Sequence, residues 1–372
     1  MRQMREQTNP MSIPWDKISG PLATAEDALA RLDERLRSSP IAEGWISRTH
    51  FQDACASLWL AGELVTLEDL VLHDARMDVR SPTHELTRAQ AALRTRRRIA
   101  GGAPDWAMSA EGLAILRGDG DSGSADATRA DEAADCRDEA APGSADDAGA
   151  DPLAEELAAL DRALESSNQF LAGGPAVARL VRDPLIYDPD WEDGEKLEAW
   201  RSGAAASQSD PPLLAAALLW DAWETNPPLE RQVWLGNLLV PALLRERRKT
   251  RAHLLCLNSG LRHIRREKRR SPDQLTRLNA FLEAITMGAE AGMKDHDRWQ
   301  LARRSLENKL KGKRSSSRLP ALVDFILARP IASAGMIATE LGVTPRAAQD
   351  MVAELGLREI TGRGRYRAWG IL

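Results

Sequence analysis

The chain has 372 residues, 43% of them hydrophobic and 28% charged, a composition typical of a water-soluble globular protein with room for two or three domains. Its three cysteines are widely spaced, which excludes a disulfide framework or a zinc site, and it has no apolar run of about 18 residues that could span a membrane, so we expect a cytoplasmic protein. The net charge of −5 is unevenly divided, because residues 241–372 carry 27 Lys and Arg against 13 Asp and Glu. This asymmetry favours a polyanionic partner such as DNA, with a solvated helical surface as the alternative.

Ala, Leu, Arg and Glu dominate the composition, which predicts a mainly helical fold. We interpret residues 1–20 as a loose leader and residues 21–117 as an N-terminal helical region. Periodic apolar residues and capping signals predict four helices in that region: Thr24–Leu36, Thr49–Ala61, one that begins after Thr66, and His84–Ile99, which Gly101 and Gly102 end.

Residues 118–151 differ from the rest of the chain. They are rich in Gly, Ser, Ala and Asp and contain 11 acidic residues, but hardly any large apolar side chain. Such a segment buries too little apolar surface to offset its chain entropy, so we predict a disordered acidic insert. A solvated linker is the simpler interpretation of its role, and occupation of the basic C-terminal surface is the alternative.

Helical patterns resume at Pro152 and continue to the C-terminal domain. We predict a helical core at residues 152–260, a basic helical connector at 261–318 and a terminal domain at 319–372. The predicted helices are 152–171, Pro212–Glu224, Leu229–Arg248 and long basic helices between Pro272 and Lys313.

The terminal domain carries a helix-turn-helix pattern between Ala334 and Val352. Ile337, Ala338 and Leu341 form the apolar face of a first helix, and Ala348, Met351 and Val352 form the facing stripe of a second. Between them, Gly342 permits a tight turn, Thr344 caps the second helix and Pro345 opens it. A match at all these positions is a fairly specific signal for a helix-turn-helix, which favours DNA binding, with a protein-docking module as the alternative.

A wing follows the helix-turn-helix, since two short strand patterns flank a Gly-rich tip in residues 357–369. We predict that Thr344 and the exposed polar residues Arg346, Gln349 and Asp350 of the second helix face the major groove. Alternate arginines of the wing, Arg363, Arg365 and Arg367, are predicted to contact phosphates or enter a minor groove. The domain itself carries only six basic and five acidic residues, so we expect the preceding basic helices to add attraction.

The order of these segments resembles the Fic-domain proteins, whose typical members transfer AMP from ATP to a hydroxyl. The resemblance rests on the segments 282–327, 56–69, 222–225 and 238–241, together with the winged helix. It implies a Fic-like helical core ahead of a winged helix-turn-helix with a small β-wing. More narrowly, the chain is similar to an uncharacterised alphaproteobacterial family, often plasmid-encoded, that joins a domain of unknown function to an HTH DNA-binding domain.

The catalytic loop of the Fic family, HPFxxGNGRxxR, corresponds to residues 226–237 but has lost its chemistry. The general-base histidine is replaced by Asn226 or Pro227, and the phosphate-binding arginine by Trp234 or Leu235. The inhibitory glutamate of the family falls on Ala61. The resemblance therefore implies a pseudo-enzyme, and we predict no catalytic residue, metal or cofactor.

The sequence offers few other candidates for catalytic residues. The six histidines are scattered, and His73-Asp74 and His84-Glu85 are better explained as surface or satisfied polar residues than as catalytic pairs. We therefore predict a non-enzymatic, homodimeric, DNA-binding transcriptional regulator. The alternatives are an enzyme with a relocated nucleotide site and a protein-interaction or antitoxin-like module without a DNA role.

Overall fold

The computed structural model describes residues 13–77, 81–118, 193–229, 232–311, 317–361 and 367–371. Contacts divide the chain into two compact units, one formed by residues 1–108 with 193–372 and the other by residues 109–192. The second unit is described only at residues 109–118, which hold the short helix α5 (Ala110–Leu116). The predicted helix at 152–171 and all but the first residue of the predicted acidic insert lie outside the described residues.

The described fold is mainly helical, as the composition predicts, and its small antiparallel sheet lies in the C-terminal domain. Helices on both sides of the predicted boundaries at 260 and 318 belong to the first unit. A cluster of buried apolar side chains runs continuously from α1 through α2, α3, α4 and α12 into the C-terminal domain. The helix-turn-helix therefore shares its core with the helical part of the unit.

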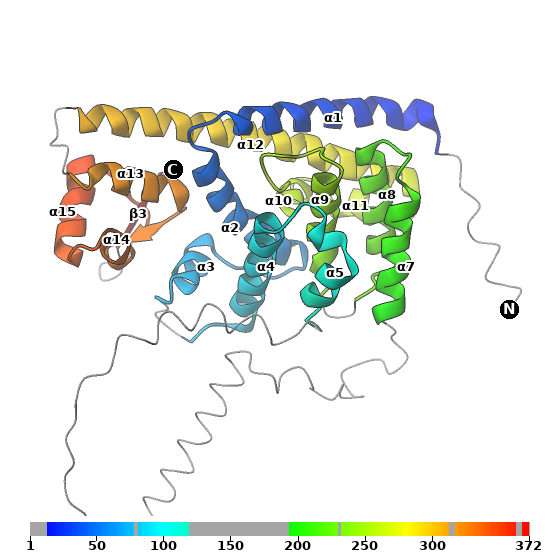
Figure 1. The fold of residues 1–372 in the computed structure, drawn as a ribbon, viewed down its shortest axis with the longest axis horizontal. Coiled ribbons are helices and arrows are strands. Elements are labelled where there is room, and N and C mark those ends of the chain that lie inside the picture. Colours follow the sequence, from blue (N-terminus) through cyan, green and yellow to red (C-terminus); the bar gives the residue numbers. More distant parts are fainter. Residues whose placement is uncertain are drawn as a thin grey trace, which may run out of the picture. The chain divides into compact units, whose positions relative to one another are not determined.

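Helix α1 (Trp15–Arg37) and helix α12 (Gln274–Leu310) run side by side (Figure 1). The prediction of a leader through residue 20 is wrong at its end, because α1 begins at Trp15 and contains Pro21. Ile18 and Leu22 belong to the same buried face of α1 as Leu29. Their burial offsets the tendency of Gly20 and Pro21 to interrupt a helix. The basic helices predicted between Pro272 and Lys313 are a single helix capped by Asp273.

Helix α2 (Ala42–Leu60) begins seven positions ahead of the predicted Thr49, and it packs against α3 (Leu67–Asp74) and α4 (His84–Gly101). Because α2 buries polar as well as apolar side chains around its circumference, its sequence shows no clear helical period. Its Asp53 accepts from Arg96 of α4 at 2.9 Å, from Asn258 Nδ2 at 3.1 Å and from the backbone N–H of Ser259 at 2.9 Å. Both members of this ion pair are almost fully buried, so the pair fixes α2 and α4 in one arrangement.

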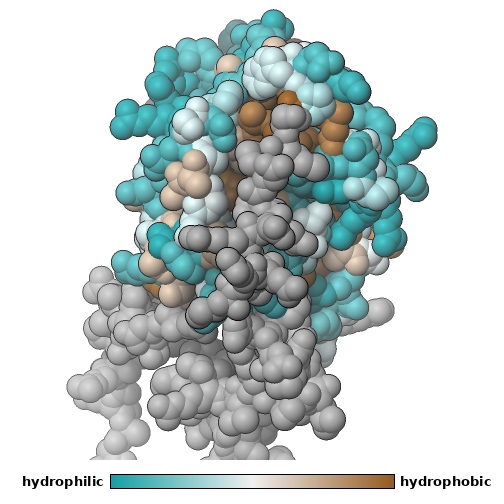
Figure 2. Space-filling view, turned by 90° about the vertical axis from the view of Figure 1, so that its right-hand side faces the viewer, coloured by the Kyte–Doolittle hydropathy of each residue, from teal (hydrophilic) through white to brown (hydrophobic). Residues whose placement is uncertain are grey.

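The remaining described helices of the first unit ahead of the C-terminal domain lie between residues 106 and 269. Their bounds are η1 (Trp106–Met108), α7 (Asp193–Ala206), α8 (Pro212–Thr225), η3 (Val233–Leu235), α9 (Gly236–Glu246), α10 (Leu257–Leu261) and α11 (Arg266–Arg269). Hydrophilic residues cover most of the described surface at the α7–α8 end, with hydrophobic residues between them (Figure 2).

The single helix predicted from Leu229 to Arg248 is wrong, because a 3-10 turn precedes α9. Trp223 Nε1 donates to Val233 O at 2.8 Å, and the Trp223 ring lies against Gly236, where an added Cβ would overlap it. This contact sets the point at which α9 begins. It also gives Gly236 a packing role between α8 and α9.

Candidate nucleic-acid interface

The described residues of the C-terminal domain, 319–361 and 367–371, form three helices and three short strands. They are α13 (Leu319–Ala328), β1 (Ala332–Ser333), α14 (Ala334–Leu341), α15 (Pro345–Leu355), β2 (Arg358–Glu359) and β3 (Ala368–Gly370). The strand order is β1-β3-β2, and both pairings are antiparallel, with Trp369 opposite Ala332 and Glu359. This sheet confirms the two strands predicted for the wing and adds β1, which the sequence pattern did not reveal.

The turn between α14 and α15 has the conformation that the sequence predicts. Gly342 adopts φ 60° and ψ 45°, a left-handed conformation that favours glycine, and Val343 N donates to Ala338 O at 3.0 Å. Thr344 Oγ1 accepts from Ala347 N at 3.2 Å, and Pro345 is the first residue of α15. These local contacts hold the two helices in the helix-turn-helix geometry.

Helix α15 divides into a buried and an exposed face. Ala348, Val352 and Leu355 are buried against the rest of the domain. The predicted site residues Thr344, Arg346, Gln349 and Asp350 are all exposed near the beginning of the helix. Donors and acceptors that can read base edges are thus gathered on one surface of the helix that would enter a major groove.

Two of these residues, Arg346 and Asp350, lie one turn apart and form an ion pair. Arg346 Nε is 3.8 Å from Asp350 Oδ1, and the two side chains are 86% and 71% exposed. An ion pair at that exposure contributes little to stability, so Arg346 is free to exchange Asp350 for an acceptor on DNA.

The wing arginines are only partly described. Arg363 and Arg365 lie outside the described residues. Arg367 directly precedes β3, and its guanidinium donates to Glu359 Oε2 at 2.8 Å and lies over the Trp369 ring. Its charge is therefore balanced within the wing, by a partner that was not predicted from the sequence.

Several cations of the basic segment 241–318 serve intramolecular contacts. Lys309 Nζ donates to Leu355 O at 2.6 Å, at the end of α15, and the Arg318 guanidinium donates to Leu341 O, at the end of α14. Arg245 donates to Ile99 O at 2.8 Å, and Arg247 to Ser207 O at 2.9 Å. Positive side chains at helix C-termini stabilise the exposed carbonyls there. The basic connector is thus in part a support for the helix-turn-helix.

A buried arginine of α2 attaches the domain to the helical part of the unit. Arg48 donates to three carbonyls of the C-terminal domain: Ile326 O at 3.1 Å, Arg329 O at 2.8 Å and Ile371 O at 2.9 Å. Its guanidinium also lies over the Trp299 ring of α12 at 4.6 Å, and burial lowers its pKa to about 10. Sequence reasoning missed this residue, because its acceptors lie about 280 to 320 positions away.

The carboxylate of the His73-Asp74 pair is held in structural contacts. Asp74 accepts from Arg97 at 2.7 and 3.0 Å and from Gln90 at 3.1 Å. Within the described residues, no group of three or more His, Cys, Asp or Glu side chains is placed to hold a metal ion. None of the described helices combines the length and apolar character needed to cross a bilayer.

Comparison with known proteins finds two family matches in this chain and a relative that matches nearly all of it. Residues 185–311 match a family described as a protein of unknown function, DUF1612, and residues 319–372 match an HTH DNA-binding domain. An uncharacterised protein of Sinorhizobium fredii, y4cF, is 46% identical over 97% of this chain and 98% of its own length. The chain belongs to the family of y4cF. The family match at residues 319–372 confirms the predicted helix-turn-helix.

Proposed function

We propose that this member of the y4cF family is a cytoplasmic transcriptional regulator that binds DNA through α15. The observation that carries the proposal is the exposed face of α15, which joins Arg346, Gln349 and Asp350 to a correctly capped helix-turn-helix. Arg346 and Gln349 supply donors for base edges, and Asp350 supplies an acceptor. The proposed targets are plasmid genes or genes that neighbour its own.

Base reading by Arg346 has a direct test. Selection from random duplexes with the purified full-length protein would first supply a preferred sequence. Arg346→Ala should then weaken binding to that sequence by about 1–3 kcal/mol and bring it closer to the affinity for unrelated duplex, because a base-edge contact discriminates between sequences. Binding is measured by fluorescence anisotropy at two salt concentrations.

Two variants separate base reading from general attraction. Arg358→Ala removes another exposed arginine of the same domain, on β2 rather than α15, and is expected to leave discrimination intact. An equal loss of affinity for all duplexes in Arg346→Ala would contradict base reading. A wild-type protein that selects no sequence and binds no duplex would contradict the proposed function and favour a protein-interaction module.

We also propose that the protein acts as a homodimer, since helix-turn-helix regulators commonly read two half-sites related by a two-fold axis. The selected sequence tests this proposal together with the first. A palindrome with half-sites about 10 base pairs apart, or a multiple of that spacing, is the expected result. A single asymmetric site bound at one protein per duplex in sedimentation experiments would contradict it.

The helical part is proposed to be a Fic-like scaffold without catalytic activity. The segment between α8 and α9 corresponds to the Fic catalytic loop. Asn226 or Pro227 stands there in place of the general-base histidine, which supports the loss of activity. Gly236 packs against the Trp223 ring, which supports a role for this glycine in the contact between α8 and α9. Incubation with radiolabelled ATP and bacterial lysate should give no labelled protein above that of a heat-denatured sample.

A further inference from the structure

A hollow of about 390 Å³ lies between the end of α2 and the segment that holds α10 and α11. Its lining includes Trp59 and five arginines: Arg262, Arg265, Arg266, Arg269 and Arg270. We call this the arginine pocket. Its volume lies within the range of about 300–1,000 Å³ typical of small-molecule sites. None of the residues that line the pocket is acidic, so its wall carries a net positive charge.

Three of these guanidinium groups are held in place by the protein. Arg262 lies over the Trp59 ring at 5.3 Å, and Arg269 Nε donates to Ile264 O at 3.1 Å. Arg270 pairs with Glu224 of α8 at 3.3 Å. Their positions are thus set before any ligand arrives, which lowers the entropic cost of binding one.

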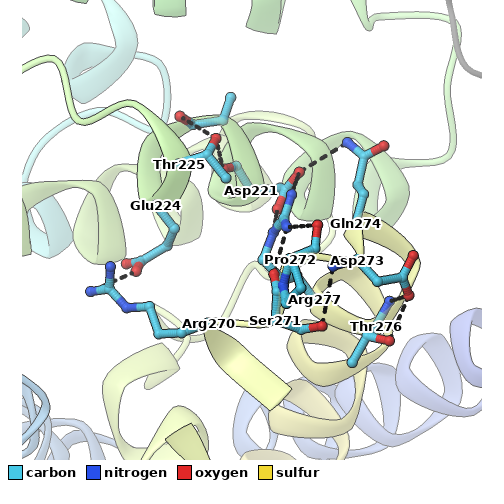
Figure 3. Close-up of polar contacts among 11 residues, drawn as sticks. Asp221, Glu224, Thr225, Arg270, Ser271, Pro272, Asp273, Gln274, Thr276 and Arg277 are labelled. Atoms are coloured by element: carbon cyan, nitrogen blue, oxygen red, sulfur yellow. Dashed lines mark hydrogen bonds and ion pairs between the residues drawn. The ribbon is translucent and has the colours of Figure 1, made fainter. Parts of the chain in front are cut away.

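The chain that follows the arginine pocket is anchored as well (Figure 3). Arg277 of α12 donates to Ser271 O at 2.7 Å and to Pro272 O at 3.0 Å, while its guanidinium also binds Asp221 of α8. Gln274 donates to the same carboxylate at 2.9 Å. These contacts tie the residues directly after Arg270 to α8 and to the start of α12.

The protein balances only part of the positive charge of the pocket, since Glu224 pairs with Arg270. Arg265 and Arg266 are exposed and form no ion pair within the described residues. Burial and the nearby charges of Arg270 and Arg266 lower the pKa of Arg269, although Glu224 and Glu267 act in the opposite direction. Burial also raises the pKa of Glu224, although the charges of Arg270 and Arg269 act in the opposite direction.

We propose that the arginine pocket binds the di- or triphosphate group of a small ligand. Guanidinium groups match phosphate oxygens with paired, charge-assisted hydrogen bonds. A single phosphate carries at most about two negative charges, so it would neutralise only part of five arginines. Trp59 is 37% exposed although Arg262 lies over its ring, so the part of the indole that remains exposed offers an aromatic surface for a nucleoside base.

Calorimetry on the full-length protein tests the pocket with three probes: ATP, inorganic triphosphate and AMP. ATP and triphosphate should bind, and AMP should bind at least about tenfold more weakly because it offers one phosphate. If ATP binds more tightly than triphosphate and Trp59→Ala removes the difference, the ligand is a nucleotide. If the two bind equally, the phosphate chain alone is recognised, as for a free polyphosphate.

Variants of the two unpaired arginines provide the control. Arg265→Ala with Arg266→Ala should weaken triphosphate binding by at least about tenfold, and the paired lysine substitutions should weaken it less, since charge remains. Lys294→Ala with Arg304→Ala removes the same charge from exposed positions of α12 and should change binding less than about twofold. Unchanged circular dichroism melting shows that each variant is folded.

The proposal is overturned if neither ATP nor triphosphate binds at millimolar concentration, or if the α12 control weakens binding as much as the pocket variant. It is also overturned if the pocket variant lowers duplex affinity for every sequence while the wild type gives no heat with triphosphate. In that case the arginines contact the DNA backbone. The proposal is independent of base reading by α15, because its readout requires no DNA.

Discussion

At the scale of single residues, several buried polar side chains make the stability of the fold depend on pH. Burial alone would raise the pKa of Asp33, but hydrogen bonds from His253 and from the backbone N–H groups of Ala252 and Arg251 outweigh it and lower the pKa. Asp33 therefore stabilises the folded chain above the unfolded pKa of about 3.9, and this contribution is lost as pH falls.

His50 of α2 has a larger effect in the same direction. Burial, with the nearby charges of Arg96 and Arg97, lowers its pKa to about 3. In the unfolded chain its pKa is about 6.5, so between pH 6.5 and 3 the unfolded state binds the extra proton. The free energy of unfolding therefore falls as pH falls through this interval, by up to about 1.4 kcal/mol per pH unit from His50 alone.

His50→Leu should make the pH dependence of the free energy of unfolding shallower between pH 6.5 and 5, whatever it does to stability at pH 7. Urea denaturation followed by far-UV circular dichroism at several pH values measures this slope. His84→Leu, at the exposed first residue of α4, is the matched control and should leave a slope close to that of the wild type. Parallel curves for wild type and His50→Leu would show that His50 does not hold its proton differently in the two states.

At the scale of elements, the ends of α14 and α15 depend on cations from outside the helix-turn-helix. Lys309 reaches Leu355 O from the last turn of α12, and Gly356 at the same end adopts φ 58°. The lysine thus neutralises the negative end of the helix that carries the candidate site. Local sequence signals set the start of α15, whereas a distant helix stabilises its end.

Lys309→Met should lower the free energy of unfolding by about 0.5–2 kcal/mol, because α15 loses a cation at its C-terminus. Urea denaturation measures the change. Lys311→Met, two positions further along and exposed, is the control and should change stability by less than about 0.5 kcal/mol. Equal effects of the two substitutions would show that the Lys309 contact contributes no more than general surface charge.

At the scale of the whole first unit, Arg48 and the shared core join the helix-turn-helix to the helical part. Three carbonyls of the C-terminal domain accept from this one buried guanidinium. A DNA-binding domain held this way moves with the helices that support it.

Arg48→Met should lower the free energy of unfolding by at least about 2 kcal/mol, because buried carbonyls lose a charged donor. Hydrogen exchange should rise first in α13 and α14, while amides of α8 and α9 stay protected. Arg31→Met removes an exposed arginine of α1 that is paired only with Asp27, and it should change neither measurement appreciably. Uniform loss of protection throughout the unit would contradict a specific role in attaching the C-terminal domain.

The sequence by itself determined the features that depend on neighbours within a few positions. The helix-turn-helix, its Gly342 turn and the caps at Thr66 and Thr344 all follow from local hydrogen bonds and apolar spacing. The mainly helical class follows from composition for the same reason. The exposed residues of α15 were predicted because an amphipathic helix with a known buried stripe has only one face left for a partner.

Only the tertiary structure decided the rest. Helix α1 begins within the predicted leader because tertiary packing buries Ile18 and Leu22. The single helix predicted from Leu229 is interrupted, and Trp223 packs against Gly236 where α9 begins. The hydrogen-bond acceptors of Lys309, Arg318 and Arg367 could not be predicted from the sequence, because tertiary folding brings each acceptor to its donor. The same holds for the arginine pocket, where a charge run that reads as a solvated surface meets Trp59 of α2 to form a hollow.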